Sequence, residues 1–324
     1  MSSILSKNMV NEGCLSYIVS CRNKKYFMKA VPPAFMDTAK QSAEILIYLT
    51  ENAFPVPGII LTKDGLPYFG IDTPEENYLY ILFNFIEGRE PELGEDIEKI
   101  GTLVGRLHNI MQSYGGGLTI RGKPFFIDRY INILRKKRYP ENKIAIFQEY
   151  GDVLWKRVEN LSPGFCHGDL HRGNLLRTSA GEYFILDFDT SCNAFPVYDI
   201  MVLCDSTNYF KFERDGYKKS KHIYERFLTG YSRYKTLNDE EIKAFYDLIA
   251  IRHYQLQATI IEVNGLDCVD ERFLDRQLDW LMEWRAQCEK AETGISLSLP
   301  SADREVNDLQ TLPLFYDEKE AEET

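Results

Sequence analysis

The stretch FCHGDLHRGNLL, residues 165–176, decides how the rest of the chain is interpreted. It holds His167, Asp169 and His171 at alternating positions, and on a strand such side chains share one face. Two imidazoles and a carboxylate on one face are one way to build a zinc site. The same residues could instead brace a turn, or they could be one catalytic aspartate among supporting residues.

The surrounding residues weaken the zinc interpretation. Gly173 follows at once and indicates a loop, and the remaining histidines near the C-terminal half, His222 and His253, add no ligand-like spacing. The turn-bracing interpretation stays open, because histidine and aspartate often satisfy backbone groups in loops.

A phosphotransfer interpretation explains more of the residues with one mechanism. Kinases of the protein-kinase type need an aspartate to accept a hydroxyl proton, an asparagine on a metal ion and a second aspartate on the metal. Asp169 is followed five positions later by Asn174, the separation found in the kinase catalytic loop. Asp187 follows in LDFD, at the end of a strand-like run where DFG would lie. The chain therefore supplies all three residue types in the required order.

The 324 residues, 44% of them hydrophobic, are enough to form a core, and we expect a soluble protein. No apolar run approaches the ~20 residues that span a bilayer, and residues 1–13 lack the pattern of a signal peptide, so we expect a cytoplasmic protein without membrane contact. The seven cysteines are scattered and interpreted as reduced thiols. A net charge of −11 argues against a nucleic-acid surface, although it could suit a cationic small molecule.

The first 90 residues indicate a small antiparallel sheet with one helix. LSYIVSC (15–21) and KYFMKAV (25–31) predict a hairpin around RNK, and 38–51 has helical spacing. The segments 58–70 and 78–88 predict further strands.

After Gly88 the pattern becomes helical, beginning with a strongly amphipathic run over 94–111. A strand-like interlude at 164–190 contains the opening stretch. Further helices are predicted near 127–137, 145–160, 196–210, 218–232, 238–263 and 270–292. The prediction is thus an α+β chain with an N-terminal lobe at 1–87, a larger mainly helical lobe at 88–293 and an acidic polar tail at 294–324.

HGDLHRGNLL and FILDFD resemble the catalytic loop and metal-binding segment of the aminoglycoside phosphotransferase and choline kinase superfamily. This resemblance implies a bilobal protein-kinase-like fold and an ATP- and Mg²⁺-dependent enzyme. It implies that Asp169 is the catalytic base and that Asn174 and Asp187 bind Mg²⁺. It further implies that His167 braces the loop and that Asp199, in VYDI, steadies it from the following helix. Arg172 stands where the family often has proline.

The N-terminal segment supplies a lysine and a helical glutamate of the kind that hold nucleotide phosphates in kinases. Lys29 ends a strand-like run and Glu44 lies in the predicted helix, so we expect the two to pair. Phe27 shares the face of Lys29 and could cover an adenine. The phosphate-covering turn departs from G-x-G-x-x-G, since NEGCLSY offers only Gly13, with Ser16 as a hydroxyl donor.

LFNFIEG, residues 82–88, resembles the connector between the lobes of such kinases. There the backbone groups near Asn84, Phe85 and Ile86 are expected to pair with adenine.

The acceptor is predicted to be a small molecule and not a protein. Gly168 replaces the arginine that precedes the aspartate in protein kinases, and no APE follows LDFD. The segment DFDTSCNAFPVYDIMV resembles type II homoserine kinases, while aminoglycosides, choline-like alcohols and sugars stay open as acceptors. Asp189 and Glu262 are candidates to receive an ammonium group, and His171 either shapes the loop or faces the acceptor.

A second hypothesis is a non-catalytic relative, such as a spore-coat protein of the kinase-like type, that binds a nucleotide or a partner. The single glycine of the phosphate turn and the charged tail favour it. The complete set of catalytic residue types counts against it. The oligomeric state and the choice between ATP and GTP stay open.

Overall fold

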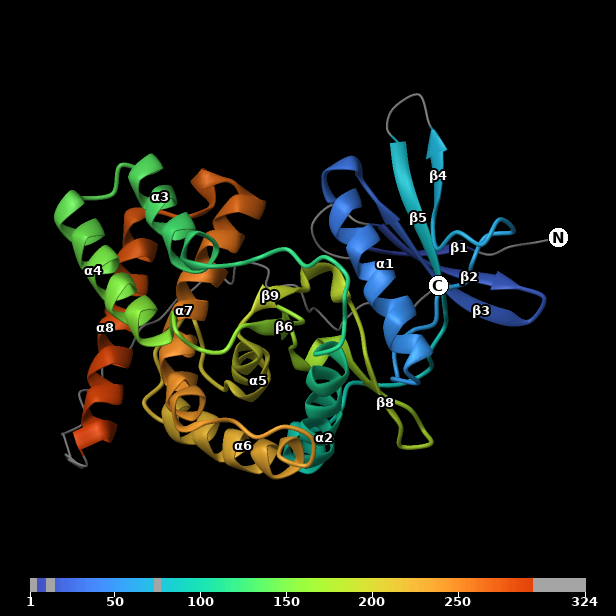
Figure 1. Ribbon diagram of the computed structural model, residues 1–324. Coiled ribbons are helices and arrows are strands. Elements are labelled where there is room, and N and C mark those ends of the chain that lie inside the picture. Colours follow the sequence, from blue (N-terminus) through green and yellow to red (C-terminus); the bar gives the residue numbers. More distant parts are fainter. Residues whose placement is uncertain (1–4, 10–14, 73–76, 294–324) are drawn as a thin grey trace, which may run out of the picture.

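The computed structural model describes residues 5–9, 15–72 and 77–293. Five strands and one helix gather on one side of the molecule, and most of the long helices lie on the other, with short strands between the two groups (Figure 1). Neither Gly13 nor the predicted tail at 294–324 lies within the described residues.

The five-stranded sheet is antiparallel with strand order β1-β2-β3-β5-β4. Its strands are β1 (Leu5–Met9), β2 (Leu15–Cys21), β3 (Lys24–Val31), β4 (Phe69–Asp72) and β5 (Asn77–Asn84). Arg22 and Asn23, both at positive φ, form the two-residue turn of the β2–β3 hairpin, as two-residue hairpins prefer. The predicted hairpin is confirmed.

The strand predicted over 58–70 is wrong for most of its length. Only Ile59 makes an isolated bridge before β4 begins at Phe69. Between them Thr62 and Leu66 are joined by a backbone hydrogen bond of 2.8 Å around Gly65, which has φ +80°. A turn at this glycine interrupts the apolar pattern, which alone cannot distinguish a strand from an extended loop.

Helix α1 (Met36–Glu51) lies beside the sheet in Figure 1 and accounts for the predicted helix. Its buried apolar residues include Ala39, Ala43, Leu46 and Leu49, which recur at helical spacing. The opposite face of the helix remains accessible.

The remaining predicted helices are all present. They are α2 (Leu93–Met111), α3 (Arg129–Lys136), α4 (Glu141–Val158), α5 (Pro196–Cys204), α6 (Gly216–Tyr231), α7 (Asp239–Asn264) and α8 (Glu271–Thr293). Helix α5 ends at Cys204, six residues before the predicted end. Helix α7 begins at a capping box between Asn238 and Glu241, which satisfies backbone N–H groups of its first turn.

Helices α2 and α6 cross at a distance that only glycine allows. A β-carbon on Gly101 would overlap the carbonyl of Phe227, and one on Gly230 would overlap the carbonyl of Glu98. This close crossing brings His108 of α2 against Tyr231 of α6, with 2.9 Å between Nδ1 and the hydroxyl.

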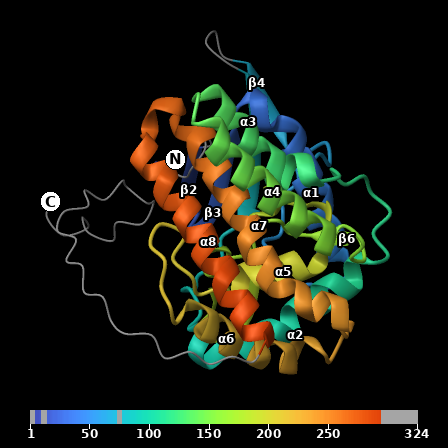
Figure 2. The same cartoon turned by 90° about the vertical axis from the view of Figure 1, so that its left-hand side faces the viewer.

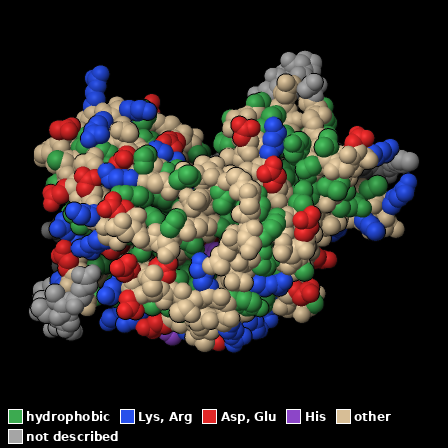
Figure 3. Space-filling view, in the orientation of Figure 1, with side chains coloured by type: hydrophobic (Ala, Val, Ile, Leu, Met, Phe, Trp, Pro, Cys, Tyr) green, Lys and Arg blue, Asp and Glu red, His purple; other side chains and the backbone are tan. Residues whose placement is uncertain are grey.

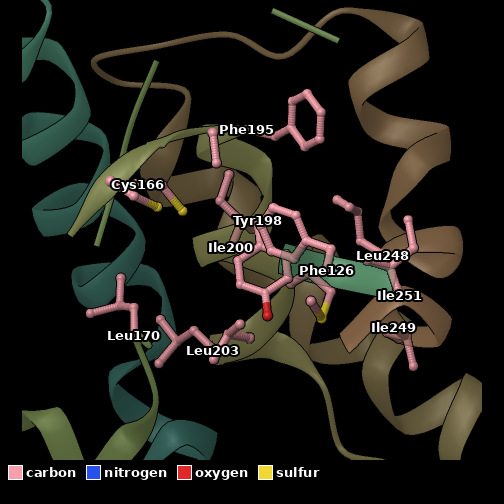
Figure 4. Close-up of a cluster of buried hydrophobic side chains, with 14 of the residues drawn as sticks. Phe126, Cys166, Leu170, Phe195, Tyr198, Ile200, Leu203, Leu248, Ile249 and Ile251 are labelled. Carbon is pink, nitrogen blue, oxygen red and sulfur yellow. The ribbon is translucent and has the colours of Figure 1, made fainter. Parts of the chain in front are cut away.

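The core beneath residues 165–176 forms where α5 meets α7. All nine residues of α5 are buried, and Figure 4 shows side chains of α5 and α7 packed together with Cys166 and Leu170 beside them. Helix α8 lies against α7 (Figure 2), where Trp284 Nε1 donates to the carbonyl of Tyr246 at 3.1 Å. No helix in the described part of the chain is both long and apolar enough to cross a membrane.

The strand-like interlude is two small two-stranded sheets. β6 (Gly164–Cys166) pairs with β9 (Cys192–Ala194), and β7 (Leu175–Arg177) pairs with β8 (Tyr183–Ile185). The loop 167–174 joins β6 to β7, so its ends are fixed by both sheets.

Candidate active site

The start of the loop 167–174 is hydrogen-bonded to the buried carboxylate of Asp199 on α5. The backbone N–H groups of His167 and Gly168 donate to it at 2.6 and 2.9 Å, and His108 Nε2 lies 3.1 Å away. Burial alone would raise the pKa of this carboxyl, but the hydrogen bond and the charge of His108 lower it below its usual value. Asp199 therefore lies where the sequence analysis placed it, and it fixes the start of the loop.

Asp169 is the carboxylate at the centre of the site. Its Oδ1 lies 3.1 Å from Nη2 of Arg252 on α7, and its Oδ2 lies 3.5 Å from Nε2 of His171. Burial raises the pKa of Asp169, but the hydrogen bond of His171 and the charge of Arg252 outweigh it and hold the pKa well below the usual range. With 39% of its side chain exposed, Asp169 is ionised and accessible.

The two histidines of the opening stretch have different surroundings. His171 Nδ1 accepts a hydrogen bond from the N–H of Gly173 at 3.0 Å, so the proton of its neutral ring lies on Nε2, toward Asp169. His167 is fully buried and its Nε2 lies 2.8 Å from the carbonyl of Leu186.

The zinc interpretation is therefore wrong. Within the described residues no group of three His, Cys, Asp or Glu side chains is placed to hold a metal ion. The physical reason is the loop, which turns His167 into the core while Asp169 and His171 stay near the surface.

The β7–β8 hairpin brings Asn174 and Asp187 together. Leu186 donates its N–H to the carbonyl of Asn174 at 2.9 Å, so the two residues lie at the open end of the hairpin. The hairpin is attached to α2 through Asp96, which accepts from Tyr183 at 2.6 Å and from Arg177 at 3.2 Å.

Asn174 and Asp187 each present an oxygen that could bind a cation. Asn174 Nδ2 donates to the backbone carbonyl of Asp169 at 2.9 Å, which leaves its Oδ1 directed elsewhere. Asp187 holds a left-handed backbone at φ 56° and has 43% of its side chain exposed. Oxygen donors suit Mg²⁺, which typically takes only one or two protein carboxylates and completes its shell with water and phosphate oxygens. These two residues fit such an ion.

Lys29 on β3 pairs with the carboxylates of Asp187 and Asp189. Its Nζ lies 3.0 Å from Asp187 Oδ1 and 2.5 Å from Asp189 Oδ2, with 12% of the side chain exposed. Burial lowers the pKa of Lys29, but the two carboxylates outweigh it and raise the pKa above its usual value. The lysine is thus a fixed cation between the sheet and the segment after β8.

The structure does not bring Lys29 and Glu44 together, and Lys29 is paired with Asp187 and Asp189 instead. Glu44 lies on the exposed side of α1 and its neighbours Ala43 and Ile45 are buried. The helix instead presents Gln41, whose Nε2 donates to the carbonyl of Ser191 at 2.7 Å. Gln41 Oε1 also accepts from the N–H of Thr119 at 3.0 Å.

The remaining residues of the expected nucleotide site lie along β2, β3 and β5. Ser16 is buried and pairs with Lys29 across the β2–β3 ladder. Phe27 lies on the face of Lys29 and its ring centroid is 6.1 Å from that of Phe83. Gly13 is outside the described residues.

The connector after β5 offers fewer free backbone groups than expected. The N–H of Asn84 already donates to the carbonyl of Gly58 at 2.8 Å, so it is not available to an adenine. Phe85 and Ile86 follow directly after β5 in the connector.

Both acids expected to receive an ammonium group already hold a cation of the chain itself. Asp189 is bound to Lys29, and Glu262 Oε2 lies 3.1 Å from Nη1 of Arg129. Neither carboxylate is therefore a free acceptor-binding group, and that expectation is not supported. Their basic partners are distant in sequence and could not be anticipated.

A cavity of about 840 Å³ lies beside the loop. The loop residues His171, Arg172 and Gly173 line one wall, and Leu203 and Asp205 at the end of α5 line another. On the face drawn in Figure 3, basic and acidic side chains are interspersed, and no broad surface of one sign is in view.

Two residues of the site were missed by the sequence analysis. Arg252 interrupts the apolar run LIAIRHYQLQA, and a charge within a buried helix requires a partner, which was the available signal. Gln41 gave no such signal, because a glutamine in an amphipathic helix is an ordinary surface residue.

The fold of this site is that of small-molecule kinases. An amicoumacin kinase, solved with AMP-PNP, Ca²⁺ and its antibiotic, superposes with a TM-score of 0.68 at 17% identity, covering 87% of this chain and 88% of that one. A microcompartment-associated aminopropanol kinase gives the same TM-score and identity, with 90% and 93% covered. The combination of helices and an antiparallel sheet in the present chain is thus that of protein-kinase-like phosphotransferases.

Residues 12–244 match the model of the phosphotransferase enzyme family, and the chain belongs to this family. It is therefore an enzyme of the phosphotransferase class, as the motif around Asp169 predicted.

Two curated relatives match part of the chain. A protein of Deinococcus radiodurans described as uncharacterized is 29% identical over 254 residues, 74% of this chain and 72% of that protein. A homoserine kinase of Sinorhizobium medicae is 25% identical over 172 residues, half of either chain.

Proposed function

We propose that the chain is an ATP- and Mg²⁺-dependent kinase that phosphorylates a hydroxyl of a small molecule. The observation that carries the proposal is the convergence of Lys29, Asn174 and Asp187 next to an accessible carboxylate, Asp169. The relatives and structural neighbours whose names state an activity include kinases of amicoumacin, aminopropanol and homoserine, which supports a small acceptor.

In the proposed reaction the acceptor oxygen attacks the γ-phosphorus of ATP, and the bond from that phosphorus to the bridging oxygen of ADP breaks. The hydroxyl proton passes to Asp169, so ATP and the alcohol become ADP, a phosphate monoester and one proton. Asp169 is suited to this role because its loop is fixed by Asp199 and because its carboxylate is ionised. His171 orients it, and His167 stabilises the loop from within the core.

The nucleotide would lie between the sheet and the loop. Lys29 would bind its phosphates, and Asn174 and Asp187 would hold Mg²⁺, which supplies charge neutralisation on the phosphates. Phe27 would cover the adenine, and the backbone of Phe85 and Ile86 would pair with it. The phosphate turn at Gly13 and Ser16 stays a prediction from the sequence.

In this proposal residues 1–87 are a nucleotide-binding lobe, and residues 88–293 are a catalytic and acceptor-binding lobe. We place the enzyme in the cytoplasm, where ATP is available and where the six described cysteines, all free, would stay reduced. Candidate acceptors are aminoglycosides, choline-like amino alcohols, homoserine-like amino acids and sugars.

Two aspartate variants test the proposal. Asp169→Asn should lower kcat by roughly 10²–10⁴ and leave the Kd of Mg·ATP within about threefold, because the base touches the acceptor and not the nucleotide. Asp187→Asn should weaken binding of Mg·ATP. Calorimetric titration and transfer of a labelled γ-phosphoryl group measure the two effects, with the exposed Asp267→Asn as control.

Full transfer activity in Asp169→Asn would contradict the assignment of the base. Binding of Mg·ATP by the wild-type chain without transfer to any acceptor would instead favour the non-catalytic hypothesis.

A further inference from the structure

Arg252 is a nearly buried cation within hydrogen-bond distance of the proposed catalytic base. It belongs to α7, and only 12% of its side chain is exposed. Nη2 lies 3.1 Å from Asp169 Oδ1, and Nη1 lies 3.3 Å from the hydroxyl of Tyr198 on α5. The guanidinium therefore lies beside the atom that would contact the attacking hydroxyl of the acceptor.

The other charged group close to Arg252 does not take up its hydrogen bonds. Asp205 attracts it electrostatically, but the carboxylate of Asp205 already accepts from the N–H and hydroxyl of Thr207 and from the hydroxyls of Tyr209 and Ser220. Among the described residues, Asp169 is the one carboxylate that Arg252 bonds. A guanidinium carries five N–H donors, so donors remain for a further anion.

The guanidinium is a permanent cation beside the position of the reacting hydroxyl. Its remaining donors attract an anionic group of an acceptor and repel a cationic one. The arrangement is thus better suited to an anionic acceptor than to a cationic one.

Two residues that line the cavity beside the loop are neighbours of this pair. His171, which lines it, is 3.5 Å from Asp169, and Asp205, which also lines it, lies within the electrostatic reach of Arg252. With about 840 Å³ it is large enough for a metabolite-sized acceptor. A carboxylate two to four bonds from the reacting hydroxyl would be within reach of the guanidinium.

We infer that Arg252 is the carboxylate-binding residue of the acceptor site, and that the acceptor is a hydroxy acid or hydroxy amino acid. This inference rests on the proposed kinase function and narrows its acceptor. Arginine suits the role because its planar fork binds a carboxylate through two parallel hydrogen bonds. Asp189 and Glu262, each bound to a basic residue, leave no matching site for a polycation at those positions.

Matched pairs of acceptors that differ only in the carboxylate test the inference on the wild-type chain. L-homoserine pairs with 3-aminopropanol, L-threonine with 1-aminopropan-2-ol, L-serine with ethanolamine and glycerate with ethylene glycol. For at least one pair kcat/KM with Mg·ATP should be roughly 10- to 100-fold higher for the carboxylate member, the size of one charge-assisted contact.

Arg252→Gln should reduce that ratio toward one, mainly through a higher KM for the carboxylate member. Arg252→Lys keeps the charge without the fork and should retain part of the preference. Arg157 lies on α4 and pairs with Asp247 on α7, the helix that carries Arg252. Arg157→Gln should leave the ratio unchanged. A purely structural role for Arg252 would lower both members of a pair equally.

Equal or better transfer to the decarboxylated members, or transfer to kanamycin or choline alone, would overturn the inference and leave the kinase function standing. No transfer to any of these acceptors, with or without a carboxylate, would overturn both. The comparison on the wild-type chain does not depend on the folding of any variant.

Discussion

Gly168 separates His167 from Asp169 and holds a backbone conformation that other residues adopt only with strain. Its φ is +87°, and a β-carbon there would overlap the carbonyl oxygen of Thr190. Gly168→Ala should therefore displace the loop, lower the Tm and lower kcat by at least about tenfold. The strain of a positive φ alone is roughly 1–2 kcal/mol, and the overlap adds to it. Thermal unfolding and a transfer assay measure the two effects.

Gly181→Ala is the matched control. Gly181 also has a positive φ of +81°, but a β-carbon there meets no atom within 4 Å. The control should show the strain without the overlap, and kcat should stay close to that of the wild type. If the two variants lose activity equally, the close approach of Thr190 is not what makes position 168 a glycine.

His253 gives the protein a stability that depends on pH. Its side chain is fully buried against Trp280, with ring centroids 4.4 Å apart, and neither ring nitrogen has a hydrogen-bond partner among the described residues. Burial lowers the pKa of His253 to about 3, against about 6.5 when unfolded. As the pH falls, His253 is therefore protonated at a higher pH in the unfolded chain than in the folded protein.

The contribution of His253 is full above pH ~6.5 and is lost as the pH falls toward ~3, at about 1.4 kcal/mol per pH unit. His253→Phe should remove this part of the dependence of the unfolding free energy on pH. Urea unfolding at several pH values between about 4.5 and 7 measures the dependence. His222→Phe, at an exposed position of α6, should keep the wild-type slope. An unchanged slope in His253→Phe would contradict the account.

At the scale of elements, the order of helices and strands could be predicted from the sequence. The contacts that each element makes with distant segments could not. The helical stripe of 38–51 predicted α1, because apolar spacing depends on local residues alone. Which polar residue of that helix faces the site depends on how the helix packs on distant segments. Glu44 matched the kinase pattern, and Gln41, three residues earlier, makes the contacts.

The corrected role of α1 can be tested with two substitutions one helical turn apart. Gln41→Ala removes the hydrogen bonds to Ser191 and Thr119, so the segment after Asp187 should lose its alignment and kcat/KM for ATP should fall roughly 3- to 10-fold, as expected for one or two hydrogen bonds.

Glu44→Gln should keep kcat/KM for ATP within about twofold, because Glu44 is exposed and Lys29 is held by Asp187 and Asp189. A larger loss in Glu44→Gln than in Gln41→Ala would restore the expected Lys29–Glu44 pair in the working enzyme.

At the scale of the whole molecule, the motif 165–176 predicted the fold class because phosphotransfer needs a fixed set of residue types at fixed spacing. The spacing from Asp169 to Asn174 is set by one loop, so it is readable in the sequence. Arg252 reaches Asp169 from 83 residues away, and such contacts exist only after α7 has packed on α5. The acceptor side of the site was therefore the part that required the structure.

The most direct test of the kinase assignment is the identity of the phosphorus products. Wild-type protein, Mg·ATP and the acceptor panel are incubated together and followed by ³¹P NMR. ADP and a new phosphate monoester should form in equal amounts with at least one acceptor, and Asp169→Asn should form both of them roughly 10²–10⁴ times more slowly. ATP that stays unchanged with every acceptor, or that yields only inorganic phosphate, would contradict the assignment.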